Sequence, residues 1–123
     1  MGAAARAARA LKLGRRGEDA AADYLKAAGF EVIGRGFRAR RGEVDLVCRR
    51  GGELFVVEVK TRSSGEFGQP AEAVDAAKRR ALAAAAAEYR ALSRWRGPVR
   101  FAVVSIRADG EAPQLELLLD PFS

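Results

Sequence analysis

Residues 43–60 read EVDLVCRRGGELFVVEVK, and this stretch decides the fold of the chain. It consists of two runs rich in β-branched and aromatic residues, 43–49 and 53–60, which are typical of strands. Gly51 and Gly52 lie between the runs, and a two-residue Gly-Gly loop favours a tight antiparallel hairpin. Both runs are apolar on both faces near their middle, which predicts strands that are covered on each side.

The same glycine pair predicts the register of the hairpin. If the two glycines form the loop, Asp45 lies opposite Glu58 and Glu43 lies opposite Lys60. Opposed residues have Cβ atoms about 4.5–5.5 Å apart, and every second side chain of a strand shares a face. The sequence therefore predicts two carboxylates and one ammonium at the same end of an apolar hairpin. A bulge or a slip of one residue would separate them.

These three groups suggest metal-assisted chemistry on a phosphodiester. Two facing carboxylates repel each other unless a positive charge lies between them, and Mg²⁺ typically takes one or two protein carboxylates and keeps several waters. Asp45 and Glu58 are therefore the candidate metal ligands, with Mg²⁺ as the expected cofactor and Mn²⁺ as the alternative. Such a metal polarises a phosphoryl oxygen and lowers the pKa of a bound water. The Lys60 ammonium would stabilise the developing negative charge or orient the attacking water.

Each candidate also has a purely structural interpretation. A Glu-x-Lys pair is commonly a cross-strand salt bridge, and Asp45 alone would cap a turn or pair with an arginine. The combination favours a site, because burying charges costs on the order of several kcal/mol per ion unless they are paired or metal-bound. Glu18 is a fourth candidate, because it shares a helical face with Leu25, where an apolar residue is expected. Its structural alternative is a carboxylate favoured by the helix dipole.

The remaining segments predict an α/β fold with a mixed sheet flanked by helices, because an antiparallel hairpin is combined with a long helical crossover. The order is α-β-β-β-α-β-β. The expected elements are a helix over 17–28 that begins near 12–16 and ends at Gly29, a strand over 30–38, a loop over 61–69, a helix over 71–92 with Pro70 at its first position, and strands over 99–107 and 114–119. We expect one domain over residues 13–123, preceded by a basic N-terminal arm over residues 1–12.

Charge points to nucleic acid as the first partner to consider. The chain has 123 residues and a net charge of +6, and 18 of its 22 basic residues are arginines. The planar donor fork of arginine suits phosphate, and a small basic domain is a typical nucleic-acid binder. The alternative explanation is a genome of high GC content, which enriches alanine, arginine and glycine together.

Composition also excludes several classes of protein. The chain has no histidine, which rules out a catalytic triad or a metal site that depends on that residue. Its single cysteine, Cys48, cannot form an internal disulfide and lies within an apolar strand pattern, which predicts buried packing. No apolar run reaches the roughly 18 residues of a membrane span, and the first residues lack the apolar centre of a secretory signal. We therefore expect a cytoplasmic protein with no membrane partner.

Three blocks of the sequence carry a resemblance to a known family. Gly17-Glu18, GEVDLV at residues 42–47 and FVVEVKTR at residues 55–62 resemble the YraN-like family of small bacterial proteins. That family is similar to the archaeal Holliday junction resolvases and, more widely, to the restriction-endonuclease-like PD-(D/E)xK nuclease superfamily. The resemblance covers residues 13–119 in the same element order. It implies a restriction-endonuclease-like core and a Mg²⁺-dependent endonuclease that hydrolyses phosphodiester bonds in DNA, with branched or structured DNA among its substrates.

The resemblance also implies catalytic roles for four residues. Asp45 and Glu58 match the metal ligands of the superfamily, Lys60 matches the lysine that activates or orients water, and Glu18 matches a glutamate that resolvase-like members use from the first helix. Relatives often carry an aspartate where this chain has Ala102. That departure favours the alternative of a nucleic-acid-binding protein of nuclease fold with little or no catalytic activity. Resolvase-like proteins work as dimers, which implies a homodimer with residues 115–119 as an apolar contact.

Basic residues beside the hairpin are the candidate nucleic-acid contacts. They predict sequence-independent, salt-sensitive binding to phosphates, whereas the alternative is an ordinary solvated surface. A third hypothesis for the whole chain is a protein-interaction domain whose charges serve a protein partner. The candidate contacts are Arg38, Arg40, Arg41 and Arg62, with a second patch at Lys78, Arg79 and Arg80.

Overall fold

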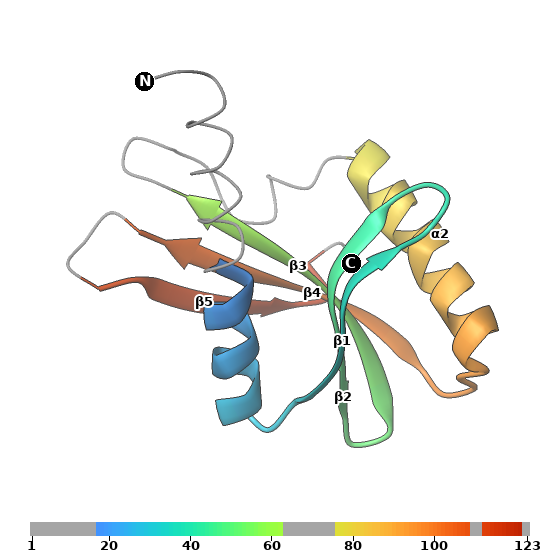
Figure 1. Cartoon of the computed structure of the whole chain (residues 1–123), viewed down its shortest axis with the longest axis horizontal. Coiled ribbons are helices and arrows are strands. Elements are labelled where there is room, and N and C mark those ends of the chain that lie inside the picture. Colours follow the sequence, from blue (N-terminus) through green and yellow to red (C-terminus); the bar gives the residue numbers. More distant parts are fainter. Residues whose placement is uncertain (1–16, 63–75, 109–111, 122–123) are drawn as a thin grey trace.

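The described residues of the chain form a five-stranded mixed sheet with one helix on each face (Figure 1). The computed structural model describes residues 17–62, 76–108 and 112–121. The expected arm over residues 1–12, the helix start near 12–16 and most of the segment before the second helix lie outside these residues. The elements are a helix over 17–27, β1 (Glu31–Arg38), β2 (Glu43–Arg50), β3 (Glu53–Arg62), α2 (Ala76–Ser93), β4 (Val99–Arg107) and β5 (Gln114–Leu119). The predicted fold class and element order are thereby confirmed.

The hairpin of β2 and β3 turns at the predicted glycines. Gly51 has a φ of 58° and Gly52 a φ of 82°, the pair of positive values that a type I′ turn requires. From this turn, antiparallel pairing runs as far as Leu46 opposite Val57. There it stops, whereas β2 stays paired with β1 as far as Glu43. The predicted cross-strand pairs beyond this point, which include Asp45 opposite Glu58 and Glu43 opposite Lys60, are therefore wrong.

The end of the pairing coincides with a break in the side-chain alternation of β2. Val44 and Val47 lie in the apolar cluster on the α2 side of the sheet, whereas Leu46 and Cys48 lie in the cluster on the other side. Regular alternation would put Val44 and Leu46 on the same face. The strand therefore rotates about its axis around Asp45. This rotation allows β2 to follow β1 away from β3.

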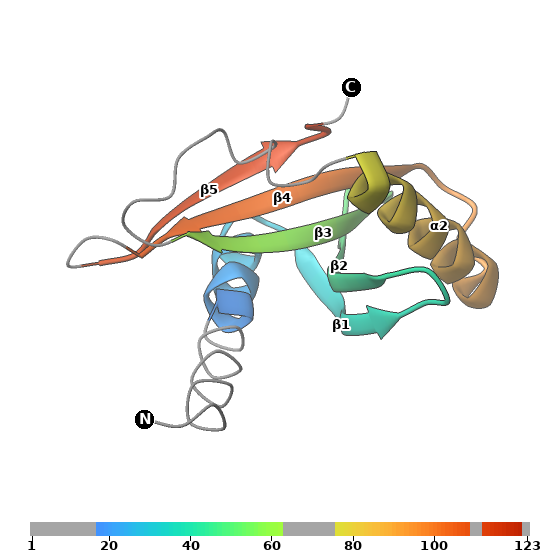
Figure 2. The same ribbon diagram turned by 90° about the horizontal axis from the view of Figure 1, so that it is seen from above.

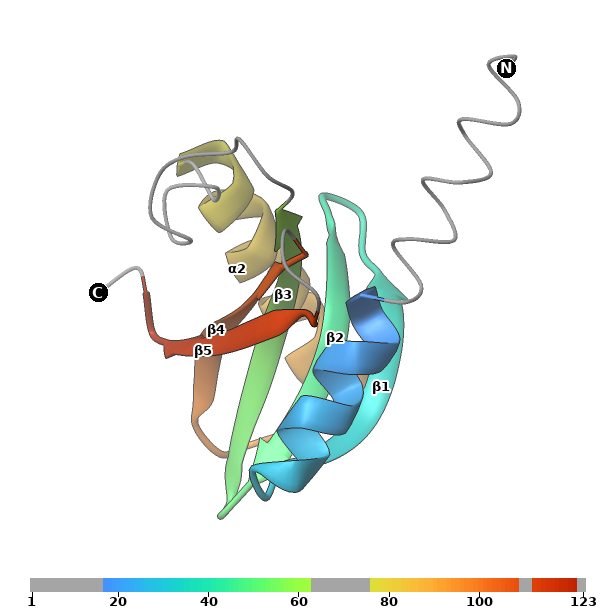
Figure 3. The same cartoon turned by 90° about the vertical axis from the view of Figure 1, so that its left-hand side faces the viewer.

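The two helices cover opposite faces of the sheet (Figures 2 and 3). The helix over 17–27 buries Leu25 against Phe55, and the ring of Phe30 packs edge-on against Phe55 at 5.0 Å between centroids. Its C-terminus lies at the predicted Gly29 and forms a Schellman cap: Gly29 has a φ of 92°, and the N–H of Phe30 donates to the Leu25 carbonyl at 2.9 Å. On the other face, α2 buries Leu82 against the sheet.

A parallel pair lies at the centre of the sheet. β4 runs parallel to β3 from Val99 opposite Leu54 to Arg107 opposite Arg62, and the intervening chain contains α2. β5 pairs antiparallel with β4 and forms an edge of the sheet. Its leucines mostly pack onto the core clusters, although Leu119 remains 37% exposed. The predicted homodimer contact over residues 115–119 stays a prediction.

Two further expectations concern packing and membranes. Cys48 is fully buried, and burial raises the pKa of its thiol to about 11, which makes it an unreactive core residue as predicted. Within the described part of the chain, no helix combines the length and the apolar character needed to cross a membrane.

Candidate metal-binding and catalytic site

Asp45 lies in the opening between β2 and β3. Its Oδ2 accepts a hydrogen bond from the backbone N–H of Val59 at 2.8 Å, so the side chain takes the place of a backbone carbonyl that β2 no longer offers. Burial, together with the charge of the neighbouring Glu58 carboxylate, raises the pKa of Asp45 to about 7. The hydrogen bond from Val59 lowers this pKa but does not outweigh the two raising effects. The structure thus places a poorly solvated carboxyl group beside a second one.

Glu58 provides the second carboxylate, from the middle of β3. Its side chain is only 11% exposed, and its Oε1 lies 3.1 Å from Nζ of Lys78 on α2. Its Oε2 is buried and has no hydrogen-bond partner among the described residues. A buried acceptor without a donor costs about 1–3 kcal/mol, and more when the group is charged.

Asp45 and Glu58 together fit a divalent cation. Both carboxylates are acceptors when ionised, so only a proton or a cation between them makes their contact favourable. Within residues 17–62, 76–108 and 112–121, no group of three or more acidic or cysteine side chains forms a complete metal site. A cation held by these two side chains would therefore complete its coordination with waters, as Mg²⁺ commonly does.

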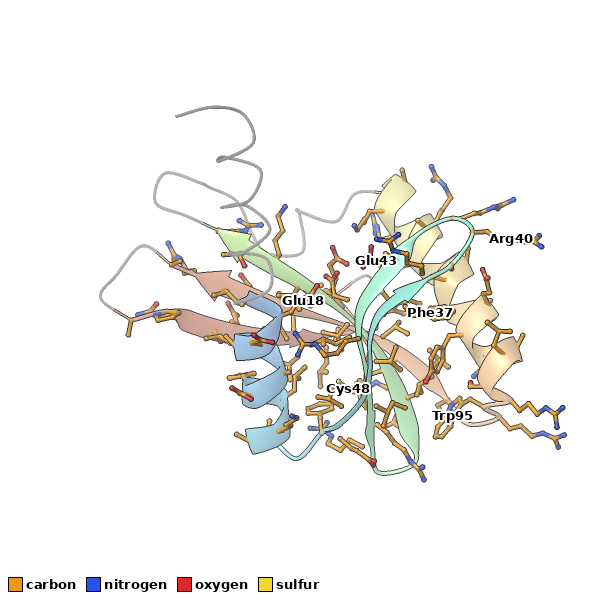
Figure 4. The ribbon with its side chains drawn as sticks, viewed as in Figure 1. Glu18, Phe37, Arg40, Glu43, Cys48 and Trp95 are labelled. Atoms are coloured by element: carbon orange, nitrogen blue, oxygen red, sulfur yellow. The ribbon has the colours of Figure 1, made fainter. Side chains whose placement is uncertain are left out.

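Glu18 approaches the same region from the first turn of the described helix. A Cβ on Gly17 would lie 2.8 Å from Oγ1 of Thr61, so the absence of a side chain lets the helix meet the end of β3. Burial raises the pKa of Glu18, the charge of Asp45 raises it further, and Arg35, whose guanidinium lies 3.7 Å from the carboxylate, opposes both. Figure 4 shows Glu18 toward the same end of the molecule as Glu43 and away from Trp95.

Lys60 shares the face of Glu58 as predicted, whereas Glu43 does not lie opposite Lys60. Lys60 follows Glu58 by two residues on β3, so the two side chains share a face, and Lys60 is half-buried. Glu43 is exposed and pairs with Arg38 of β1, on the side of β2 that faces away from β3. The structure therefore brings Asp45 and Glu58 together, and both Asp45 and Glu43 lie within electrostatic reach of Glu18.

The turn between β1 and β2 carries predicted nucleic-acid contacts and rests on α2. A Cβ on Gly42 would meet the Cβ of Ala81 at 3.1 Å, and the N–H of Arg40 donates to Oε2 of Glu88 at 3.1 Å. Arg38, Arg40 and Arg41 are exposed there. Arg62, in contrast, is only 9% exposed, so it offers little surface to a phosphate.

Lys78 is a site residue that sequence reasoning placed elsewhere, in a surface patch with the two arginines that follow it. The signal that would have found it is its spacing, because Lys78 precedes the buried Leu82 by four residues and so lies on the same helical face.

Ala102 lies outside the site: it is 2% exposed and belongs to the apolar cluster beneath the helix over 17–27. Glu58 points to the opposite, α2 side.

Comparison with known proteins agrees with the resemblance in the sequence. The profile of the uncharacterised protein family UPF0102 matches residues 17–106. A UPF0102 protein of Rhodococcus opacus is 48% identical over 114 residues, which cover 91% of this chain and 97% of that protein. One from Symbiobacterium thermophilum is 48% identical over 96 residues, 77% of this chain and 81% of that protein. One from Geobacter metallireducens is 40% identical over 111 residues, 89% of this chain and 91% of that protein. The chain belongs to the UPF0102 family, which is the YraN-like family that its sequence resembles.

Proposed function

We propose that this protein is a metal-dependent endonuclease that hydrolyses phosphodiester bonds in DNA. The observation that carries the proposal is the buried Oε2 of Glu58, which has no hydrogen-bond partner in the described part of the chain and lies beside the Asp45 carboxyl group. A structural salt bridge accounts for only one oxygen of Glu58, the one near Lys78. It leaves unexplained why the other oxygen is buried next to a second carboxylate. A proton on Asp45, whose pKa is raised to about 7, would bridge the two groups in the metal-free protein, and a divalent cation would take its place between both carboxylates.

The residues of the site divide the chemical tasks between them. Asp45 and Glu58 would hold Mg²⁺ or Mn²⁺, which supplies Lewis-acid polarisation and a more acidic bound water. The N–H of Val59 keeps the Asp45 carboxyl group in the opening between the strands. Lys60, on the face of Glu58, would stabilise negative charge on the phosphate. Glu18 would accept a proton, a role favoured by its raised pKa.

The exposed arginines of the β1–β2 turn support DNA as the substrate. Arg38, Arg40 and Arg41 are exposed around this turn, which packs against α2 through Gly42 and Ala81, so phosphates could be contacted without any reading of bases. The resemblance to junction resolvases extends the proposal to branched or structured DNA and to a homodimer as the active form. The cytoplasm is the location that we propose, from the sequence pattern of the first residues.

The proposal is tested by incubating the purified chain with duplex, single-stranded and four-way junction DNA in Mg²⁺, in Mn²⁺ or in EDTA. We expect cleavage with either metal, none in EDTA, and none from Asp45→Asn or Lys60→Ala. Glu116→Gln is the matched control, because it removes an exposed carboxylate on β5. Cleavage that survives in both site variants would refute the assignment of these residues.

The second candidate is a nucleic-acid-binding protein with little turnover. Ala102, which stands where relatives often carry an aspartate, is the observation that favours it, although its side chain lies in the apolar cluster and not on the face of Glu58. Salt-sensitive binding to DNA without cleavage in any metal would support this candidate. Failure to bind any nucleic acid would instead favour a protein-interaction domain.

A further inference from the structure

We propose that Lys78 is a positioning residue of the site, which holds one oxygen of Glu58 so that the other is presented, beside Asp45, to the cation. This inference rests on the proposed function, because it assumes that the two carboxylates bind a metal. It assigns to α2 a part in a site that is otherwise built from the strands and the first helix.

The position of Lys78 on α2 is the first step of the argument. The buried residues of the helix are Leu82, Ala85 and Ala86, and Lys78 precedes Leu82 by four residues, which places it one turn earlier on the same face. An apolar residue would be expected at this point of the face. Lysine fits because its aliphatic stem lies along apolar surface while its ammonium reaches the polar opening.

The contact with Glu58 is the second step. The ammonium lies 3.1 Å from Oε1, and the Lys78 side chain is 46% exposed while that of Glu58 is 11% exposed. Such a partly solvated ion pair contributes little to stability. Its geometric effect is larger, because it fixes which oxygen of Glu58 faces α2. The remaining oxygen, Oε2, is the buried one without a partner among the described residues.

A different role for Lys78 predicts the opposite effect on metal affinity. If its charge only repelled or competed with a cation, removing that charge would strengthen cation binding. If instead it orients the carboxylate, removing it would weaken binding, because hydrogen-bonded partners of metal ligands typically affect affinity by about 10–100-fold. The sign of the change therefore separates the two roles.

The test measures Mn²⁺ binding to the full chain through the electron paramagnetic resonance signal of free Mn²⁺. We expect Lys78→Met to weaken binding roughly 10–100-fold and Lys78→Arg to restore most of it. Arg96→Met is the control, because it removes an exposed positive charge beyond the C-terminal end of α2, and it should leave binding unchanged. Circular dichroism of each variant verifies the fold, and Lys78→Gln replaces the methionine variant if that variant does not fold.

The outcomes distinguish this inference from the proposed function. If the wild-type chain binds Mn²⁺ and Asp45→Asn abolishes binding, the metal site stands. Unchanged or tighter binding by Lys78→Met would then overturn the role of Lys78 alone. If the wild-type chain binds no Mn²⁺, the metal site and the role of Lys78 both fail.

Discussion

At Asp45 a side chain makes a hydrogen bond that a regular hairpin would make through its backbone. The N–H of Val59 is satisfied by the Asp45 carboxyl group at 2.8 Å, which anchors that group in the opening although a second carboxylate lies beside it. An interior polar group without a partner destabilises a fold, so the pairing of Asp45 with Val59 and of Glu58 with Lys78 limits the cost of this arrangement. One oxygen of Glu58 has no hydrogen-bond partner within residues 17–62, 76–108 and 112–121.

Replacing Glu58 by glutamine should abolish cleavage and leave the metal-free protein as stable as before or slightly more stable. An amide N–H₂ can donate to Asp45, and a typical hydrogen bond contributes about 1 kcal/mol, while the lost pair with Lys78 is worth about 0–1 kcal/mol because Lys78 is nearly half exposed. Urea unfolding in EDTA measures the stability, and the DNA cleavage assay measures the activity. A large loss of stability would instead identify Glu58 as a structural salt-bridge partner.

The raised pKa of Asp45 predicts how the stability of the metal-free protein depends on pH. Its ordinary pKa is 3.8 and its pKa in the folded chain is about 7, so the folded state holds the proton more tightly than the unfolded state. The contribution of this proton to stability is fully present below pH 3.8 and is lost as the pH rises through about 7. Urea unfolding in EDTA across this window should show a fall in the free energy of unfolding that Asp45→Asn reduces. An identical pH profile for the variant would contradict the assignment.

At the scale of elements, the hairpin of β2 and β3 has two ends with different tasks. The turn at Gly51 and Gly52 is set by local backbone conformation, whereas the other end opens at Leu46 and holds the site. Because the two ends are separated by the paired length of the strands, changes at the turn should affect stability without affecting the site.

A matched pair of substitutions in the turn tests this separation. Gly52→Val forces a β-branched residue to a φ of 82°, which should cost about 1–2 kcal/mol. Gly51→Asn, at a φ of 58°, should be nearly neutral because asparagine is favoured in type I′ turns. Thermal melts measure the difference, and the cleavage rate per folded molecule should stay the same for both variants. Loss of activity in a folded Gly52→Val protein would show that the turn influences the site.

At the scale of the whole molecule, the chain has a net charge of +6, and exposed basic residues lie near both ends of α2. The turn between β1 and β2 adds exposed arginines at the end that lies nearer the site, and Arg94 and Arg96 are exposed at the other end. If only the first group contacts DNA, substitutions in that group should change the salt dependence of DNA binding, whereas substitutions of Arg94 and Arg96 should not.

The double variant Arg40→Gln with Arg41→Gln should weaken DNA binding and flatten its salt dependence. Each lost phosphate contact lowers the slope of log K against log salt by about 0.9, so the pair should lower it by roughly 2. Fluorescence anisotropy with labelled duplex in EDTA measures the slope. The control, Arg94→Gln with Arg96→Gln, should leave it unchanged, and equal effects of both pairs would indicate diffuse attraction instead of a defined surface.

The candidate site is only partly visible in the sequence. The chemistry of Asp45, Glu58 and Lys60 can be read from residue types and strand spacing, and the helix face of Glu18 from its periodicity. The register beyond Leu46 cannot be read from the sequence, because a regular hairpin and a hairpin that opens have the same local sequence pattern. Lys78 was grouped with its charged neighbours for a similar reason, since its role depends on where α2 docks. The burial of Arg62 likewise follows from tertiary packing.

The sequence by itself determined the turn at Gly51 and Gly52, the cap at Gly29 and the order of helices and strands. These features depend on backbone conformations that neighbouring residues favour, so a short stretch of sequence is enough to predict them. Only the tertiary structure decided that β2 leaves β3 at Leu46 and that Lys78 reaches Glu58. Both depend on contacts between different elements. β2 stays paired with β1 after its pairing with β3 has ended, and Lys78 reaches Glu58 because α2 packs on that face of the sheet, so neither feature is contained in a local stretch of sequence.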